Sequence, residues 1–140
     1  MTAAALAASM RLMASEPVPD LRITDLAPVV LRESRRAHLD PLLVAAVAWH
    51  ESRWRMDARG AAGEVGVMQI HPRGAGAFRC VGLPADLDGN VRCGVAILAW
   101  VRRRCGGGPE RWLGAYAGHA CGPSVYARRV LASVRAAGKR

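Results

Sequence analysis

The apolar residues of this chain are concentrated most strongly in the run from Leu42 to Trp49, which follows Asp40 and Pro41. An aspartate side chain can accept the free N–H groups of a first helical turn, and the fixed φ of proline suits the first helical position. A helix that is apolar on every side packs inside a core rather than on a surface. The pattern therefore predicts a buried helix that begins at Pro41.

Glu51 continues an apolar stripe of that helix, three residues after Ala48 and four after Val47. Desolvation and the negative end of the helix dipole both raise the pKa of a carboxyl group, whereas nearby basic side chains lower it. A carboxyl group with a raised pKa holds a proton near neutral pH and can act as a general acid. The alternative is a helix-end glutamate that faces solvent or pairs with an arginine.

The remaining periodic segments predict a mainly helical chain with one glycine-rich segment soon after Glu51. Glycines at positions 60, 63 and 66 indicate a tight, irregular and partly β segment, and the loop-rich region after Gly74 leaves room for at most a short helix. Further helices are expected over about 24–37, 91–104, 110–116 and 124–137.

One domain suits a chain of 140 residues, and no internal repeat or second domain is visible. Pro17 and Pro19 block helix continuation near the start of the chain. We therefore expect residues 1–22 to form a poorly ordered N-terminal lead and residues 23–140 to form a single globular helical domain.

The composition points to an anionic partner. Lysine and arginine number 20 against 11 acidic residues, which gives a formal net charge of +9, and a hydrophobic fraction of 51% excludes wholesale disorder. Nucleic acid, acidic lipid and an acidic polymer such as a cell wall all fit this charge. Nucleic acid is the weakest of these, because no basic run is interleaved with stacking aromatic residues. We expect no nucleic-acid partner.

No apolar stretch is long enough and free enough of charge to form a transmembrane segment. The first residues lack a basic region, and Arg11 interrupts their apolar run, so they make a poor secretory signal as they stand.

Four cysteines, Cys80, Cys93, Cys105 and Cys121, contain no C-x-x-C pair, which disfavours zinc and thioredoxin-like sites. An even count in a small basic protein suggests two disulfides and an oxidising compartment. We expect Cys80 to pair with Cys93 and Cys105 with Cys121, because each pair closes a short loop. The alternative is four inert buried thiols in a cytosolic protein. No metal or cofactor is expected.

Four short motifs occur in order along the chain: Glu51-Ser52, Gly66-Val67-Met68-Gln69, Asn90-Val91-Arg92-Cys93-Gly94, and Ala115-Tyr116 with Tyr126 ten residues later. In these motifs the chain resembles the soluble lytic transglycosylase domain family, over about residues 24–135. The resemblance implies a lysozyme-like fold, mainly α with minimal β, and a substrate cleft. It also implies cleavage of peptidoglycan between N-acetylmuramic acid and N-acetylglucosamine, with formation of a 1,6-anhydro product.

The resemblance also implies roles for individual residues. Glu51 would act as acid and then as base, and Gln69 would line the cleft and bind substrate. Met68 would pack beneath Gln69, although a plain core role fits it equally well. Tyr116 would place its hydroxyl near Glu51, where it would orient the acid or hold an acetamido group. Ser52 would orient the carboxylate or cap the helix end.

Two positions depart from the family pattern. Ala117 stands where the family has asparagine, so a polar contact is absent or comes from another residue such as His119, and Gly60 stands where a serine is common. A hydrolase would need a second acid. Glu64 and Asp57 are the candidates near Glu51, and we interpret both as structural.

The resemblance implies a periplasmic or secreted monomer that acts on peptidoglycan glycan strands, with a larger cell-envelope or secretion assembly as a further partner. Two alternatives stay open. One is a hydrolytic lysozyme of the same fold. The other is a catalytically weak glycan-binding module of a secretion, pilus or phage-tail machine.

Overall fold

The computed structural model describes residues 1–80, 82 and 85–138. Residues 81, 83, 84, 139 and 140 lie outside this part, and all five belong to the expected domain over 23–140. The described residues are mainly helical. Their helices are α1 (Ala3–Met13), α2 (Asp20–Arg36), α3 (Pro41–Ser52), α4 (Pro72–Ala77), α5 (Leu87–Cys105), α6 (Pro109–Tyr116) and α7 (Val125–Gly138).

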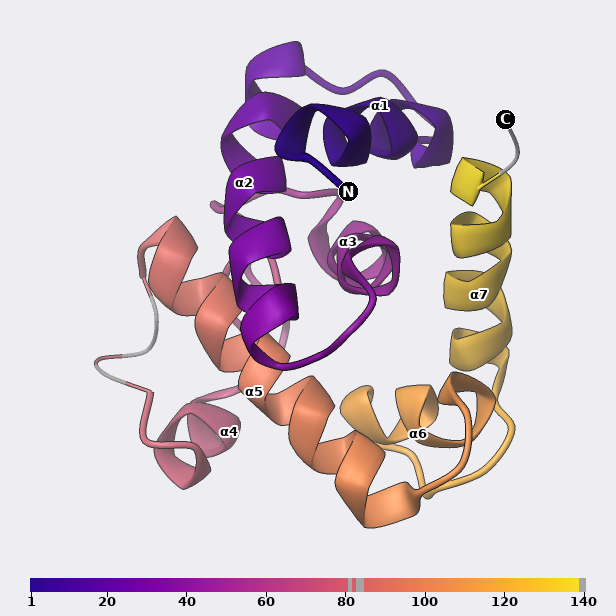
Figure 1. The fold of residues 1–140 in the computed structure, drawn as a ribbon. Helices are drawn as coiled ribbons and strands as arrows, with labels where there is room; N and C mark the ends of the chain where they lie inside the picture. Colours follow the sequence, from indigo (N-terminus) through magenta and orange to yellow (C-terminus); the bar gives the residue numbers. More distant parts are fainter. Residues whose placement is uncertain (81, 83–84, 139–140) are drawn as a thin grey trace.

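Helix α3 is the centre of the fold. Figure 1 shows it nearly end-on, with α1 above it, α2 to its left and α7 to its right. The carboxylate of Asp40 accepts the Leu42 N–H at 2.9 Å, and Pro41 occupies the first turn, as the sequence predicts. The side chains from Val44 to Ala48 are fully buried. Arg53 adopts a left-handed conformation, with φ of 54°, and ends the helix.

Helix α5 crosses the molecule and packs against α2 and α6, and α7 packs against α1, α3 and α6. The observed N-cap of α5 is Asp86, whose carboxylate accepts the Gly89 N–H at 2.6 Å. The sequence pattern suggested Asp88 or Asn90 for this role. Asn90 has a different function, because its side chain points away from the helix end and into the core.

The glycine-rich segment that follows α3 contains almost no regular β structure. In the described part of the chain, Val65 pairs with Arg59 and with Ile70 in isolated antiparallel bridges. Gly66, with φ of 79°, turns the chain back so that residues 67–70 lie against α5. This fold is the mainly α, lysozyme-like arrangement with minimal β that the resemblance implied.

Residues 3–13 are a packed helix, whereas the sequence interpretation expected a poorly ordered lead over residues 1–22. The hydroxyl of Thr2 caps α1 by accepting the Ala5 N–H at 3.1 Å. Leu6, Met10 and Met13 are buried along one face, which packs on α2, α3 and α7. The alanines between them favour helix, and the buried stripe supplies the stability that a short helix lacks in isolation.

Two disulfides, Cys80–Cys93 and Cys105–Cys121, connect the loops around α5. These are the pairs that the loop lengths suggested. The first joins the segment after α4 to the buried face of α5, and the second joins the end of α5 to the loop between α6 and α7. In the described ranges, no helix combines the length and the apolar character that a bilayer-spanning segment needs.

Candidate active site

A cleft of about 540 Å³ opens beside the C-terminal end of α3. The glycine-rich segment, α4, α5, α6 and α7 supply its other walls. Its polar lining includes Glu51, Glu64, Gln69, His71, Tyr116 and Tyr126. A hollow of this size with a few converging polar groups is the usual form of a small binding site.

Glu51 is partly buried on the last turn of α3, where its carboxylate faces the cleft. Burial raises the pKa of this carboxyl group above its usual value, and the negative charge of Glu64 raises it further. A hydrogen bond from Tyr126 acts in the opposite direction by stabilising the charged form. Because burial is the largest of these effects, the net shift in the pKa of Glu51 is upward.

Tyr126, on the first turn of α7, holds that carboxyl group in place. Its hydroxyl donates to Oε1 of Glu51 at 2.6 Å. Burial and the charge of Glu51 raise the pKa of the Tyr126 phenol, so this phenol stays protonated and remains a donor. From its spacing, Tyr126 was noted only as part of a motif, and the position beside Glu51 was expected for Tyr116.

Glu33 of α2 is a second buried carboxyl group, and its partners differ from those of Glu51. It is almost fully buried, and Arg32, Arg36 and Arg92 surround it with N···O distances of 2.9, 3.3 and 3.7 Å. Among the described residues, no lysine or arginine lies within ion-pair distance of Glu51. Three arginines therefore surround Glu33, whereas the Glu51 carboxyl group accepts a hydrogen bond from a phenol hydroxyl.

Gln69 lines the cleft together with Glu51 and has a constrained conformation. Its φ is 48°, in the left-handed region that a non-glycine residue rarely adopts. Its side-chain amide donates to the carbonyls of Ala58 at 3.2 Å and Gly66 at 2.9 Å. These bonds fix the amide group, and the remaining oxygen lies next to Gly60. Gln69 is therefore a preorganised polar group in the cleft wall.

Glu64 lines the same cleft, although it was interpreted from the sequence as structural. Its Oε2 accepts the Ala62 N–H at 3.1 Å and lies 1.9 Å from the point where a Cβ on residue 60 would stand. The absence of a side chain at Gly60 therefore creates the space that the Glu64 carboxylate fills. Glu64 has a structural contact and a position in the cleft at the same time.

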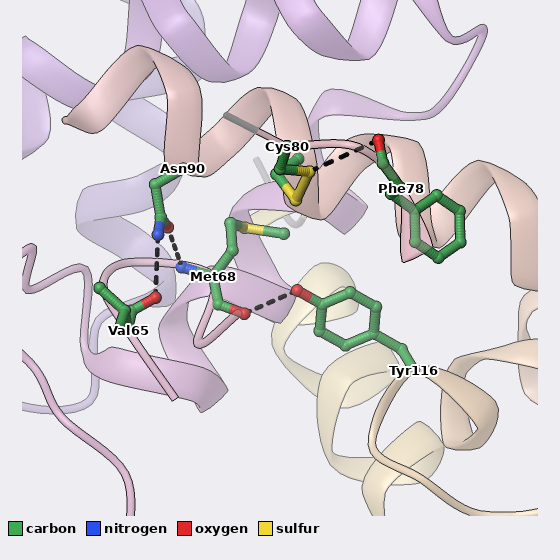
Figure 2. Close-up of a disulfide and its surroundings, with 7 residues drawn as sticks. Val65, Met68, Phe78, Cys80, Asn90 and Tyr116 are labelled. Atoms are coloured by element: carbon green, nitrogen blue, oxygen red, sulfur yellow. Dashed lines mark hydrogen bonds between the residues drawn. A yellow bond between two sulfur atoms is a disulfide. The ribbon is translucent and has the colours of Figure 1, made fainter. Parts of the chain in front are cut away.

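Tyr116 also lines the cleft, but its hydroxyl has a different partner from the one expected. It donates to the carbonyl of Met68 at 2.6 Å, as Figure 2 shows. Burial and the charge of Glu51 raise the pKa of this phenol well above its usual value, which keeps it protonated. Tyr116 therefore holds the backbone next to Gln69, and Tyr126 provides the hydrogen bond to the acid.

Ser52 and Met68 do not line the cleft. Met68 is fully buried, and Ser52 is 4% exposed. The Ser52 hydroxyl lies 2.8 Å from the carbonyl of Val67 and 3.1 Å from that of Ala48, and it accepts the Arg55 N–H. Ser52 therefore joins the end of α3 to the segment that carries Gln69, and any contribution from these two residues to a ligand site is indirect.

The asparagine and glycine of the third motif support the second. Asn90 accepts the Met68 N–H and donates to the Val65 carbonyl, both at 2.8 Å, and its side chain is fully buried (Figure 2). Gly94, one turn later, leaves room for Met68, because a Cβ there would lie 2.6 Å from the Met68 side chain. The two motifs are therefore one packed unit that sets the position of Gln69.

Two histidines in the cleft were not identified from the sequence as site residues. His50 is hydrogen-bonded to Ser133 of α7 at 2.8 Å, and Nδ1 of His71 accepts the Arg73 N–H at 3.1 Å. His119, suggested as a replacement for the polar contact missing at Ala117, lies outside the cleft lining. No group of His, Cys, Asp and Glu suited to a metal ion occurs among the described residues.

Comparison with known proteins gives one finding of similarity. Residues 28–139 match the family described as the Transglycosylase SLT domain. No curated protein matches the chain. The match covers the five helices from α3 to α7, most of α2 and every residue named in the cleft.

Proposed function

The chain belongs to the Transglycosylase SLT domain family, and from this membership and the surroundings of Glu51 we propose that it is a peptidoglycan lytic transglycosylase with one catalytic carboxyl group. Its reaction would cleave the β-1,4 bond between N-acetylmuramic acid and N-acetylglucosamine. The muramic sugar would leave as a 1,6-anhydro product.

The observation that supports this proposal most strongly is the state of Glu51. Its carboxyl group faces a cleft, its pKa is raised mainly by burial, and a phenol hydroxyl holds it in one orientation. A general acid needs these three properties, because it must reach the leaving oxygen, carry a proton near neutral pH and present that proton in the right direction.

In the first half of the proposed reaction, Glu51 gives its proton to the glycosidic oxygen. The C1–O bond breaks, N-acetylglucosamine leaves with the new hydroxyl group, and positive charge develops at C1 of the muramic sugar. Glu51 is now a carboxylate. The Tyr126 hydroxyl donates to it at 2.6 Å and stabilises the charge that forms in this step.

In the second half, the C6 hydroxyl of the same sugar attacks C1, and Glu51 takes its proton. A new C6–O–C1 bond closes the anhydro ring, no water is consumed, and Glu51 returns to its starting state. Because the attacking hydroxyl is part of the reacting sugar, its effective concentration is high. This advantage allows the reaction to proceed without a second catalytic carboxylate.

The other residues would position substrate. Gln69 is fixed in the cleft wall, and its carbonyl oxygen is available beside Gly60 for a sugar amide or hydroxyl. Tyr116 would act through the Met68 carbonyl, and Ser52 would act through the Val67 carbonyl. Both would hold the segment that carries Gln69. Met68 would support this segment from the core.

A hydrolytic lysozyme is the second candidate, because Glu64 places another carboxylate in the cleft. Two carboxyl groups that flank the scissile bond allow water to take part as the attacking nucleophile. Glu64 is already engaged with the Ala62 N–H, which favours a role in positioning and electrostatics.

Digestion of purified peptidoglycan, followed by mass spectrometry of the soluble fragments, tests the proposal. Wild-type protein should release anhydro-muropeptides, and Glu51→Gln should release none while it still binds glycan. Glu110→Gln, an exposed residue of α6, is the matched control and should behave as wild type. Reducing ends in place of anhydro ends would assign the hydrolytic reaction. Equal lysis by wild type and Glu51→Gln would reject the role of Glu51, and binding without lysis by wild type would assign a binding module.

We propose a location outside the cytoplasm, periplasmic or secreted, for a monomer that works on glycan strands. The two disulfides support this, because they persist in oxidising compartments, and the net charge of +9 suits an acidic polymer.

A further inference from the structure

A second hollow, of about 300 Å³, adjoins the cleft on the far side of Gly118. Gly118 lines both spaces. Trp100 and Arg104 of α5 form one side of this hollow, and His119 and Cys121 of the loop after α6 form the other. The Cys105–Cys121 disulfide ties that loop to the end of α5, so both sides belong to one braced structure.

The wall between α4 and α5 leads from the cleft to this hollow. Ile97 lines the cleft, and Trp100 and Arg104 follow it at one-turn intervals on the same face of α5. Gly74 of α4 lies against Ile97, and Phe78, the C-cap residue of α4, contacts the Trp100 ring edge-on, with 5.7 Å between the ring centres. A glycan strand that leaves the cleft along this wall would therefore pass Trp100 and Arg104.

Arg104 is a cation held in place without an acidic partner. Its guanidinium lies over the Trp100 ring, 5.1 Å from the ring centre. Among the described residues, no carboxylate lies within ion-pair distance of it, and no acidic side chain lines the hollow. Arg102, two residues earlier, instead donates to the carbonyls of Ala37 and His38.

We propose that this hollow binds a carboxylate carried by the glycan strand in the cleft, with Arg104 as the group that pairs with it. The proposal rests on the proposed function, because it takes the occupant of the cleft to be a peptidoglycan strand. The planar guanidinium fits a carboxylate with two parallel hydrogen bonds. A sugar ring stacked on Trp100 is disfavoured, because Arg104 covers a face of that ring.

Two parts of peptidoglycan can supply the carboxylate. One is the peptide stem, which bears several, and the other is the lactyl group of a muramic sugar that has lost its stem. Both present the same chemistry to Arg104. Strands with stems and strands stripped by an amidase, which leaves the lactyl carboxylate, separate the two sources.

Binding to soluble strands tests the proposal in a Glu51→Gln background, which prevents turnover. Three ligands are compared: strands with stems, amidase-stripped strands, and N-acetylglucosamine oligomers that carry no carboxylate. Arg104→Ala should weaken binding to a carboxylate-bearing strand by about two- to fivefold, the range for an ion pair at an exposed site. Arg103→Ala is the matched control, since it removes an equal charge from the neighbouring exposed position.

A loss confined to strands with stems assigns the stem carboxylate, a loss confined to stripped strands assigns the lactyl group, and a loss on both shows that Arg104 accepts either carboxylate. Trp100→Leu should weaken binding of the same ligand, because Arg104 then loses its contact with the indole ring. The proposal is overturned if Arg104→Ala and Arg103→Ala behave alike, or if Arg104→Ala weakens the uncharged oligomer equally. These outcomes do not depend on which product the active protein releases, so a failure of the proposed reaction is recognised separately.

Discussion

Tyr126 donates a hydrogen bond of 2.6 Å to Glu51, although α7 and α3 place the two residues 75 positions apart in the chain. The bond orients the carboxyl group toward the cleft and stabilises its charged form. It therefore opposes the effect of burial on the pKa of Glu51, while the donor itself remains protonated. The strength of the acid is set by the balance between these influences.

Removal of the Tyr126 hydroxyl should change both the orientation and the pKa of the Glu51 carboxyl group. In Tyr126→Phe, the pKa of Glu51 should rise, because the bond that favours the carboxylate is lost. Since Glu51 must be protonated to start the proposed reaction, the alkaline limb of the kcat/KM profile should move to higher pH. kcat should fall by about 10- to 100-fold, the value of a hydrogen bond to a charged group. An unchanged alkaline limb would show that Tyr126 does not act on the acid.

Removal of the Glu64 charge should move the same limb in the opposite direction. In Glu64→Gln, the pKa of Glu51 should fall, because a negative charge that raises it is gone. Gly60→Ala provides an independent route to the same change, since the new Cβ would overlap Oε2 of Glu64 and displace the carboxylate. Both variants should lose activity at the alkaline end of the profile first. A shift to higher pH in either one would contradict this electrostatic role.

Glu51→Gln should also change stability in a pH-dependent way. The pKa of Glu51 is raised above its usual value of 4.5 in the folded state, so ionisation disfavours that state. The penalty is absent below the unfolded-state pKa, grows as pH rises toward the folded-state pKa, and is constant above it. Denaturant unfolding should therefore find Glu51→Gln more stable than wild type at pH 7, with a smaller difference at pH 4. A difference that does not vary with pH would exclude this origin.

Loss of the Asn90 side chain should weaken both the fold and the cleft. Asn90→Ala leaves the Met68 N–H buried without its acceptor, at about 1–3 kcal/mol, whereas the Val65 carbonyl still accepts the Ile70 N–H. We expect the free energy of unfolding to fall by about 1–3 kcal/mol. Ala96→Ser, at an exposed position of the same helix, should change it by less than about 0.5 kcal/mol. A small effect of Asn90→Ala would mean that water replaces the side chain.

Local sequence signals predicted much of the helical structure. Asp40 and Pro41 set the start of α3, and the apolar run after them gave its burial. The start of α5 was placed too late, because Asp88 and Asn90 have the side chains of N-caps, whereas Asp86 performs the capping. Asn90 is used elsewhere, in contacts with residues more than twenty positions away, which the local pattern does not contain.

The arrangement of the site depended on long-range packing. The motif spacing identified Glu51, Gln69 and two tyrosines, but the placement of α6 and α7 decides which tyrosine reaches the acid. The contribution of Glu64 arises from the missing side chain at Gly60, a steric relationship visible only in three dimensions.

Helix α1 lies outside residues 28–139, which carry the family match, yet its Leu6 and Met10 are completely shielded from solvent. The apolar surfaces of α3 and α7 that α1 covers would be exposed to solvent in a fragment trimmed to the matched residues. Such a fragment would expose an apolar surface beside α3, which carries Glu51 on its last turn, and would be prone to aggregate. We therefore expect α1 to unfold together with the residues that match the family.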